Sequence, residues 1–186
     1  MATETVAGPC TLRELKAILT APTGGVVVYP TTSYDEVYLN LFIGDEEIAH
    51  RKATLRRIGI THVINAGQGE TEFHVNTNAA FYVGTAIRFL GIEATDMMSC
   101  DMTIHFQTAA TFIEEGLREG KVLVHCREGI SRSATVVLAF LILRKNMTVQ
   151  EAVRNVRRYR EINPNDGFLQ QLCDLNAIVF KSRCSK

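Results

Sequence analysis

The sequence lacks an excess of charge of either sign. Lysine and arginine together number 20, aspartate and glutamate also number 20, and the formal net charge of the 186 residues is zero. A chain without a broad basic field has no general attraction for nucleic acid or for an anionic membrane. We therefore expect neither as a main partner, and any attraction for phosphate has to be local.

Long apolar segments are also missing. The first ten residues have neither the basic start nor the apolar run of a secretory signal, and no later run approaches the length of a membrane span. We therefore expect a soluble protein of the cytoplasm, the nucleus or both. The sequence contains no internal repeat, and it indicates no particular oligomeric state.

Cysteine pairs of the Cys-x-x-Cys type are absent. The five cysteines are odd in number and unevenly spaced, which argues against both a disulfide framework and a zinc site. We therefore expect reduced thiols. The cysteines are Cys10, Cys100, Cys126, Cys173 and Cys184.

What the sequence does contain is enough apolar material for one core, since 46% of its residues are hydrophobic. We expect a flexible N-terminus at residues 1–10, one folded domain at 11–180 and a C-terminal tail at 181–186. Helical patterns alternate with short apolar strands, which favours an α/β fold with a central mixed, largely parallel sheet flanked by helices.

Caps, turns and periodicity indicate where the elements lie. A capping-box pattern at Thr11 predicts a first helix, Asp45 predicts the start of a second, and Gly59 predicts a helix end near 55–58. We expect further helices near 105–117, 133–143, 149–159 and 167–180, and Thr148 and Asn165-Asp166 are candidate caps for the last two. We expect strands within 34–43 (two, joined by a turn), 61–65, 88–92 and 121–125.

One segment carries a chemical signature. Residues 121–134 read Lys-Val-Leu-Val-His-Cys-Arg-Glu-Gly-Ile-Ser-Arg-Ser-Ala, so an apolar strand leads into Cys126, and Arg132 follows at the start of a helix. A loop between a strand and a helix N-terminus points backbone N–H groups inward, and the helix end adds partial positive charge. Such a loop binds a phosphate and favours the thiolate of Cys126 as a nucleophile.

The other positions of this loop suit the same chemistry. Gly129 can adopt backbone angles closed to other residues and leaves the amides open to a phosphate. Arg132 offers a planar fork of donors for two phosphoryl oxygens. Ser133 can cap the helix and stabilise the thiolate as it leaves. The alternative is that Cys126 is a buried structural cysteine, but the combination of strand, Cys-x5-Arg, glycine and helix start favours catalysis.

Candidates for proton transfer lie outside the loop. His125 directly precedes the nucleophile, but its side chain points to the opposite face of the strand. We therefore predict that it orients the loop from behind. A core histidine with only a structural role is the alternative, and the two roles are compatible. A departing alkoxide or phenoxide needs a proton donor. Asp96, in a polar stretch after an expected strand, is our candidate. Asp101 is the rival, with a helix cap as its alternative role.

These residues give the chain a resemblance to the protein tyrosine phosphatase superfamily, and within it to the small atypical dual-specificity phosphatases of the VHR type. The resemblance covers about residues 12 to 180. It rests on Gly-Ile-Thr-His-Val-Ile-Asn-Ala (59–66), His-Val-Asn-Thr-Asn (74–78), Leu-Gly-Ile-Glu-Ala-Thr-Asp (90–96), His-Cys-Arg-Glu-Gly-Ile-Ser-Arg-Ser (125–133) and Arg-Glu-Ile-Asn-Pro-Asn-Asp-Gly-Phe-Leu (160–169).

The resemblance implies a Cys-based phosphatase fold that hydrolyses phosphotyrosine and phosphoserine or phosphothreonine on proteins. It implies a phosphocysteine at Cys126 and no metal or other cofactor. Arg132 would bind the phosphoryl group, Asp96 would act as acid and then as base, and Ser133 would assist thiolate departure. Arg160 matches a basic residue that holds a second phosphate, and mitogen-activated protein kinases are the implied substrates. The phosphate-binding loop would comprise Arg127, Glu128, Gly129, Ile130 and Ser131.

Two positions, Ile130 and Cys100, depart from the VHR pattern, and a third, Arg160, has a second interpretation. Ile130 replaces an aromatic residue, and the loss of a ring from the pocket wall is expected to weaken packing against a phosphotyrosine relative to a phosphothreonine. Cys100 also replaces an aromatic residue, and we expect a small core residue there, with a disulfide to Cys126 on oxidation as the alternative. Without the resemblance, Arg160 would be interpreted as a solvated charge at a helix end.

Other functions fit the sequence less well. Lipid phosphatases and RNA triphosphatases tend to line the loop with extra basic residues, whereas here the charges of Arg127 and Glu128 offset. A rhodanese-like sulfurtransferase would leave Arg132 unexplained. The non-enzymatic alternative is a catalytically weak phosphoprotein-binding module of the same fold.

Overall fold

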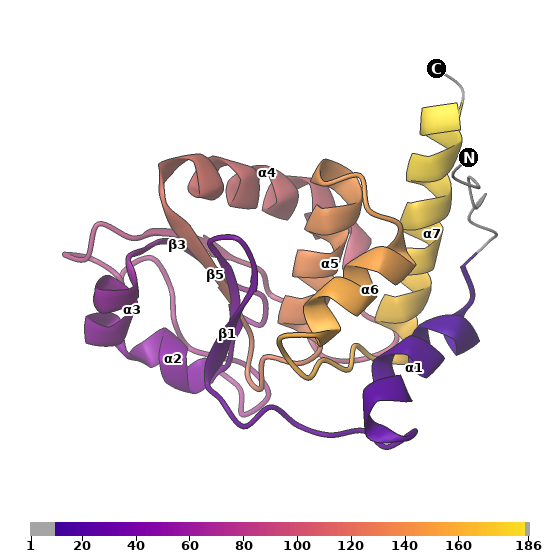
Figure 1. Cartoon of the computed structure of the whole chain (residues 1–186). Helices are drawn as coiled ribbons and strands as arrows, with labels where there is room; N and C mark the ends of the chain where they lie inside the picture. Colours follow the sequence, from indigo (N-terminus) through magenta and orange to yellow (C-terminus); the bar gives the residue numbers. More distant parts are fainter. Residues whose placement is uncertain (1–9, 185–186) are drawn as a thin grey trace.

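The computed structural model describes residues 10–184 and has a five-stranded mixed sheet at its centre (Figure 1). The strand order is β1-β2-β5-β3-β4. β1 and β2 pair antiparallel, and the other neighbours are parallel, so the expected mixed, largely parallel sheet is confirmed. The strands are β1 (Tyr34–Tyr38), β2 (Leu41–Gly44), β3 (Ile60–Asn65), β4 (Arg88–Gly91) and β5 (Lys121–His125).

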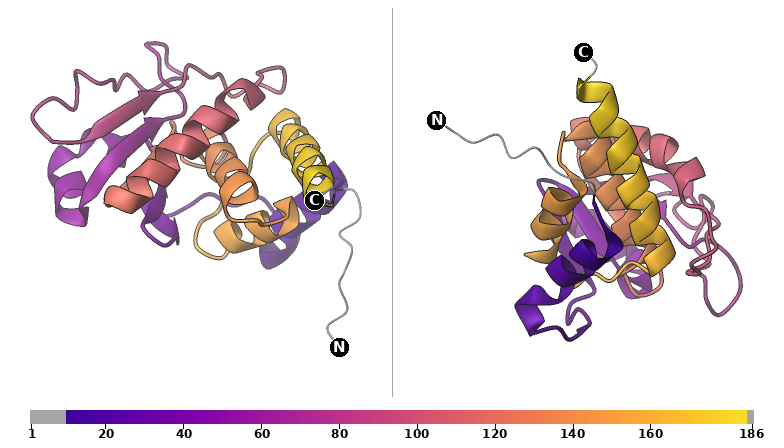
Figure 2. Two further views of the ribbon diagram at one scale, coloured as in Figure 1. Left: turned by 90° about the horizontal axis from the view of Figure 1, so that it is seen from above. Right: turned by 90° about the vertical axis from the view of Figure 1, so that its right-hand side faces the viewer.

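Helices cover both faces of this sheet (Figures 1 and 2). Val122 and Val124 of β5 face a large core shared with helices α1 and α4 to α7, whereas Leu123 faces a smaller core under α2 and α3. This alternation is what the two-residue period of a strand requires. The helices are α1 (Leu12–Thr20), α2 (Glu46–His50), α3 (Lys52–Ile58), α4 (Thr103–Glu119), α5 (Arg132–Arg144), α6 (Val149–Arg157) and α7 (Asp166–Cys184), with a 3₁₀ turn at Ala21–Thr23.

The helix that follows the signature loop is the most enclosed one. Every residue of α5 from Arg132 to Ile142 is buried. The helix packs between α4, α6 and α7, so its N-terminus is held by packing from several sides. This enclosure gives the loop before α5 a rigid support.

The expected helix signals are present as hydrogen bonds. Thr11 caps α1 by accepting the N–H of Glu14 at 3.2 Å, and Asp45 caps α2. Gly59 ends α3 at φ +86°. α4 extends beyond the expected range at both ends, and α7 continues through Cys184 into the expected tail. The expected flexible segment 1–10 lies outside the described residues except for Cys10.

The cysteines correct one expectation. Cys10 forms a disulfide with Cys173 of α7, with Cα atoms 5.4 Å apart, so these two thiols are not reduced. α1 lies beside α7 (Figures 1 and 2), which makes neighbours of two residues separated by 163 positions. Spacing along the sequence cannot reveal such a pair. Cys100 and Cys126 have free thiols.

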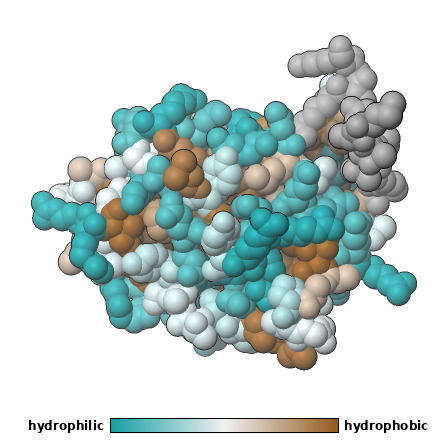
Figure 3. All heavy atoms as spheres, in the orientation of Figure 1, coloured by the Kyte–Doolittle hydropathy of each residue, from teal (hydrophilic) through white to brown (hydrophobic). Residues whose placement is uncertain are grey.

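The surface is mixed in polarity. On the face drawn in Figure 3, hydrophobic residues form separate patches between hydrophilic ones. Among the described helices, none combines the length and the apolar character needed to cross a bilayer.

The enclosure of α5 leads to a stability prediction. Phe140 is fully buried, so Phe140→Ala is expected to lower the free energy of unfolding by about 3–5 kcal/mol through lost burial and the cavity left behind. Leu39→Ala, at a position 75% exposed, is the control and should change it by less than about 0.5 kcal/mol. Denaturant unfolding followed by circular dichroism measures both. Equal losses in the two variants would contradict the packing described.

Candidate active site

A cavity of about 560 Å³ opens where the loop after β5 meets the loops after β3 and β4. Carboxyl ends of parallel strands share one edge of a sheet, which is where such folds bind ligands. The signature loop provides one wall, and two other loops provide the rest. The lining residues are Glu72, Phe73, Thr95, Asp96, Met97, Cys126, Arg127, Glu128, Ile130 and Arg132.

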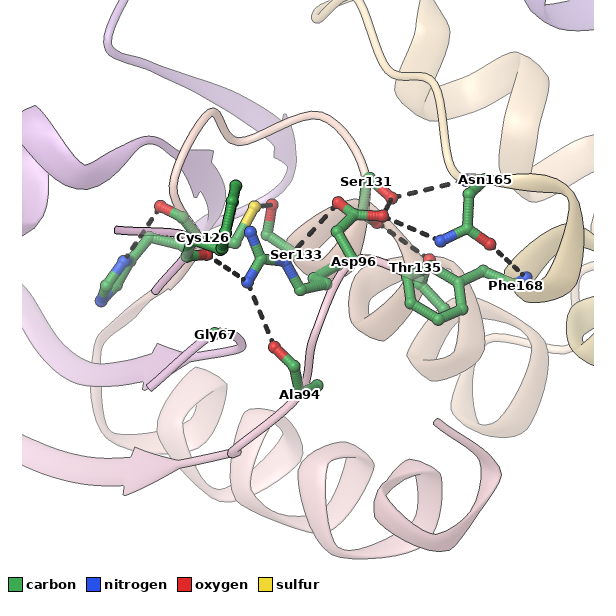
Figure 4. Close-up of polar contacts among 12 residues, drawn as sticks. Gly67, Ala94, Asp96, Cys126, Ser131, Ser133, Thr135, Asn165 and Phe168 are labelled. Carbon is green, nitrogen blue, oxygen red and sulfur yellow. Dashed lines mark hydrogen bonds and ion pairs between the residues drawn. The ribbon is translucent and has the colours of Figure 1, made fainter. Parts of the chain in front are cut away.

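Cys126 and Ser133 form a close pair in this cavity. The Sγ atom of Cys126 lies 3.2 Å from the Oγ atom of Ser133, and both residues are almost fully buried (Figure 4). Ser133 is the second residue of α5, and no side chain caps that helix, so the expected capping role is wrong. The Ser133 hydroxyl faces the sulfur instead, where it can donate a hydrogen bond to a thiolate.

Arg132 is held by backbone carbonyls and keeps a donor free. The residue is 4% exposed, and its Nη1 atom donates to the carbonyl oxygens of Phe73 (3.0 Å) and Ala94 (3.1 Å). Its Nε atom has no hydrogen-bond partner among the described residues and lies 3.5 Å from Oδ2 of Asp96. A buried donor without a partner at a cavity indicates a site for an acceptor supplied by a ligand.

Gly67 makes this position of Arg132 possible. A Cβ atom on Gly67 would lie 2.5 Å from Nη1 of Arg132. Any other residue at this position would therefore push the guanidinium away from its carbonyl partners. The sequence analysis did not identify Gly67, because the close approach exists only in the folded chain.

Asp96 is fixed by two donors from other elements. Its Oδ1 atom accepts hydrogen bonds from Oγ of Ser131 and Nδ2 of Asn165, each at 2.8 Å (Figure 4). Asn165 also caps α7, because its Oδ1 atom accepts the N–H of Phe168 at 3.1 Å. The sequence suggested only the cap, and the second role of Asn165 was missed.

The rival carboxylate lies elsewhere. The Oδ1 atom of Asp101 accepts the N–H of Thr103 at 2.9 Å and its hydroxyl at 2.6 Å, at the start of α4. These hydrogen bonds lower the pKa of Asp101. Asp101 does not line the cavity, so its position fits the helix-terminal role.

Gly129 is required for a reason that the sequence did not reveal. Its φ of +68° lies in the left-handed region, as expected for a glycine. In addition, a Cβ atom would lie 2.5 Å from the carbonyl oxygen of Gly44 and 2.6 Å from Nη2 of Arg160. Neither of these neighbours lines the cavity, so the glycine allows close packing behind the loop.

His125 lies in a fully buried position behind the nucleophile. Its Nε2 atom is 3.4 Å from the hydroxyl of Thr77, and its Nδ1 atom is 3.4 Å from the carbonyl oxygen of Cys126. Burial lowers the pKa of His125 to about 3. The imidazole is therefore neutral at physiological pH, and it does not line the cavity. Its role in orienting the loop stays a prediction.

Arg160 differs from the expectation of a solvated charge at a helix end. The residue is 1% exposed and forms an ion pair with Asp35, with Nη1 and Oδ2 2.7 Å apart. α6 ends three residues earlier, at Arg157, and the chain then turns beneath the signature loop. Arg160 does not line the cavity. Its match to a second-phosphate ligand is therefore not supported by its position.

Apolar side chains form part of the cavity. Ile130 provides no ring, as the sequence indicated, but Phe73 and Met97 also line the cavity and are 63% and 59% exposed. An aryl group in the cavity would therefore meet an aromatic side chain from the loop after β3. The sequence analysis missed Phe73. Cys100 is partly buried against the main core and does not line the cavity.

Comparison with known proteins gives consistent matches. A family model described as dual specificity phosphatase, catalytic domain, matches residues 41–178. Mouse dual specificity protein phosphatase 26 is 49% identical over 144 residues, which cover 76% of this chain and 66%, just under two thirds, of that protein. Mouse dual specificity protein phosphatase 13B is 47% identical over 143 residues, which cover 76% of this chain and 71% of that protein.

A solved structure also resembles the chain. The crystal structure of human tyrosine phosphatase-like serine/threonine/tyrosine-interacting protein superposes with a TM-score of 0.70 at 32% identity. The match covers 79% of this chain and 97% of that chain.

The buried His125 predicts a pH-dependent stability. The unfolded chain protonates this imidazole near pH 6.5, whereas the folded chain does so only near pH 3. Stability from this residue is therefore complete above pH 6.5 and falls as the pH drops toward 3. Between pH 7.5 and 5.5 the wild type should lose about 1 kcal/mol more than His125→Gln in denaturant unfolding. The same pH dependence in both proteins would contradict a neutral, buried His125.

Proposed function

The chain belongs to the dual specificity phosphatase family, and we propose that it is a cysteine-dependent protein phosphatase acting on phosphotyrosine and on phosphoserine or phosphothreonine. One observation carries the proposal: Arg132, whose buried Nε donor has no hydrogen-bond partner among the described residues, lines the same cavity as Cys126 and Asp96. A phosphoryl group placed there would meet a nucleophile, a cation and a proton donor.

In the first proposed step, the thiolate of Cys126 attacks phosphorus. A sulfur–phosphorus bond forms, the bond to the leaving oxygen breaks, and that oxygen takes the electron pair and a proton from Asp96. Arg132 and the loop N–H groups hold the other phosphoryl oxygens as their charge redistributes.

In the second proposed step, water attacks the phosphocysteine. Asp96, now a carboxylate, accepts a proton from the water, and the sulfur–phosphorus bond breaks with its electrons returning to sulfur. Ser133, 3.2 Å from the sulfur, would donate a hydrogen bond to the departing thiolate. Both steps use groups of the chain and water, so the proposal includes no metal or other cofactor.

The cavity favours protein substrates. Arg127 and Glu128 line it with opposite charges, so they add no net attraction for a polyphosphate. Phe73 and Met97 provide apolar surface for the ring of a phosphotyrosine. Mitogen-activated protein kinases in the cytoplasm or nucleus are the substrates we propose from the VHR resemblance. The buried pair of Arg160 and Asp35 adds no support for a second phosphate pocket.

A second candidate function is a phosphoprotein-binding module without turnover. The similarity to a human protein named tyrosine phosphatase-like supports this candidate. The presence of Cys126, Arg132 and Asp96 in one cavity favours the enzyme. Turnover of an aryl phosphate separates the two functions.

The nucleophile is tested by Cys126→Ser. This variant should show no turnover of an aryl phosphate while it retains binding of a phosphotyrosine peptide, because the loop and Arg132 remain. Mass spectrometry of rapidly quenched wild type should find a phosphoryl adduct on the peptide that contains Cys126. Cys100→Ser is the control and should keep its activity. Binding without turnover by the wild type would favour the module instead.

The proton donor is tested by comparing leaving groups. Asp96→Asn should slow hydrolysis of a poor leaving group by about a hundredfold or more, and that of a good one much less, because only the poor one needs the proton in the transition state. Steady-state kinetics on two aryl phosphates measure the difference. Asp101→Asn is the matched control. If Asp101→Asn showed the loss and Asp96→Asn did not, the assignment would be wrong.

A further inference from the structure

The peptide groups of the signature loop share one orientation. At one end, the N–H of Glu46 donates to the carbonyl oxygen of Arg127 at 2.9 Å. At the other, the N–H of Asn163 donates to the carbonyl oxygen of Ile130 at 2.8 Å. Neither donor residue lines the cavity, so these two carbonyls point to the back of the loop.

Arg160 binds the two carbonyls between them. Its Nε atom donates to the carbonyl oxygen of Gly129 at 2.8 Å, and its Nη2 atom to that of Glu128 at 3.4 Å. Backbone N–H groups serve the neighbouring carbonyls, but these two depend on a side chain. Arg160 is also the largest of the fully buried side chains, so its place behind the loop is closely packed.

Because the peptide bond is planar, the hydrogen bonds from Arg160 to the two carbonyls also fix the direction of the N–H groups that follow them. In a trans peptide the C=O and the following N–H point in opposite directions. The carbonyls of Glu128 and Gly129 turn toward Arg160, so the N–H groups of Gly129 and Ile130 turn away from it, toward the cavity side. These are two of the N–H groups that an anion in the loop would use.

Asp35 keeps the guanidinium in place. Its Oδ2 atom lies 2.7 Å from Nη1 of Arg160, which also donates to the carbonyl oxygen of Thr32 at 3.0 Å. The hydroxyl of Thr32 donates to the same Oδ2 atom at 2.7 Å. A buried guanidinium without a counter-ion would be costly. Asp35 at the start of β1 and Thr32 just before that strand therefore anchor Arg160.

We propose that Arg160, held by Asp35, is a positioning residue that orients the Gly129 and Ile130 N–H groups for binding of a phosphoryl group. This inference rests on the proposed function for the identity of the oxyanion. The orientation of the loop itself can be measured by oxyanion binding without turnover. Arg160 thus acts through the backbone and does not contact the substrate.

The full-length variant Arg160→Lys tests the proposal. Lysine keeps the charge for Asp35, but its single ammonium cannot reproduce a planar fork that serves two carbonyls and a carboxylate. Inorganic phosphate should bind about tenfold more weakly, the size expected for one lost hydrogen bond. Asp35→Asn should also weaken phosphate binding. Arg158→Ala, at an exposed position just after α6, is the control and should bind phosphate as the wild type does.

Alkylation of Cys126 separates loop orientation from general loss of structure. Iodoacetate is an anion that the loop attracts, whereas iodoacetamide is neutral. The ratio of their alkylation rates should fall in Arg160→Lys by about the same factor as phosphate affinity. A merely structural role would change both rates together.

Several outcomes would overturn the proposal. If Arg160→Lys keeps the phosphate affinity and the alkylation ratio of the wild type, the proposal is wrong. It is also wrong if Arg160→Lys loses affinity only for bisphosphorylated peptides, because Arg160 would then be a ligand for a second phosphate. If Arg160→Lys does not fold, wild-type phosphate affinity in Asp35→Asn overturns it. If the wild type binds phosphate but shows no turnover, only the proposed function is wrong. If the wild type does not bind phosphate, both the proposed function and the role of Arg160 are wrong.

Discussion

The orientation of the peptide groups in one short loop is the constraint on which the candidate site depends. Their carbonyls face donors behind the loop, and from the planarity of the peptide bond we infer that their N–H groups face the cavity, where Cys126 lies. α5 begins directly after the loop and is enclosed by other helices, which fixes the position of its N-terminus. The proposed anion binding and nucleophilic attack depend on this arrangement.

Two buried arginines serve this loop from opposite sides. Arg132 is held by the carbonyls of Phe73 and Ala94 and keeps its Nε donor free at the cavity. Arg160 is held by Asp35 and directs its donors to the loop backbone. In the proposed function, Arg132 would bind the phosphoryl group and Arg160 would shape the binding site. The two arginines differ in role because their neighbours differ.

Local signals in the sequence predicted much of the fold. Caps at Thr11 and Thr148, the glycine at position 59 and the apolar strand before Cys126 depend on residues close in the chain, and the structure contains each of them. The disulfide of Cys10 with Cys173 was not predicted, because it depends on the packing of α1 against α7.

The sequence by itself determined the loop with the candidate nucleophile, the alternation of strands and helices and the two carboxylate candidates. Each of these predictions depends only on the types of residues that lie close together in the sequence. Only the tertiary structure decided between Asp96 and Asp101 as a cavity residue, brought Asn165 to Asp96 and buried Arg160 behind the loop. The physical reason is distance along the chain. Asp96 and Asn165 are 69 residues apart and Arg160 and Asp35 are 125 apart, so folding alone makes them neighbours.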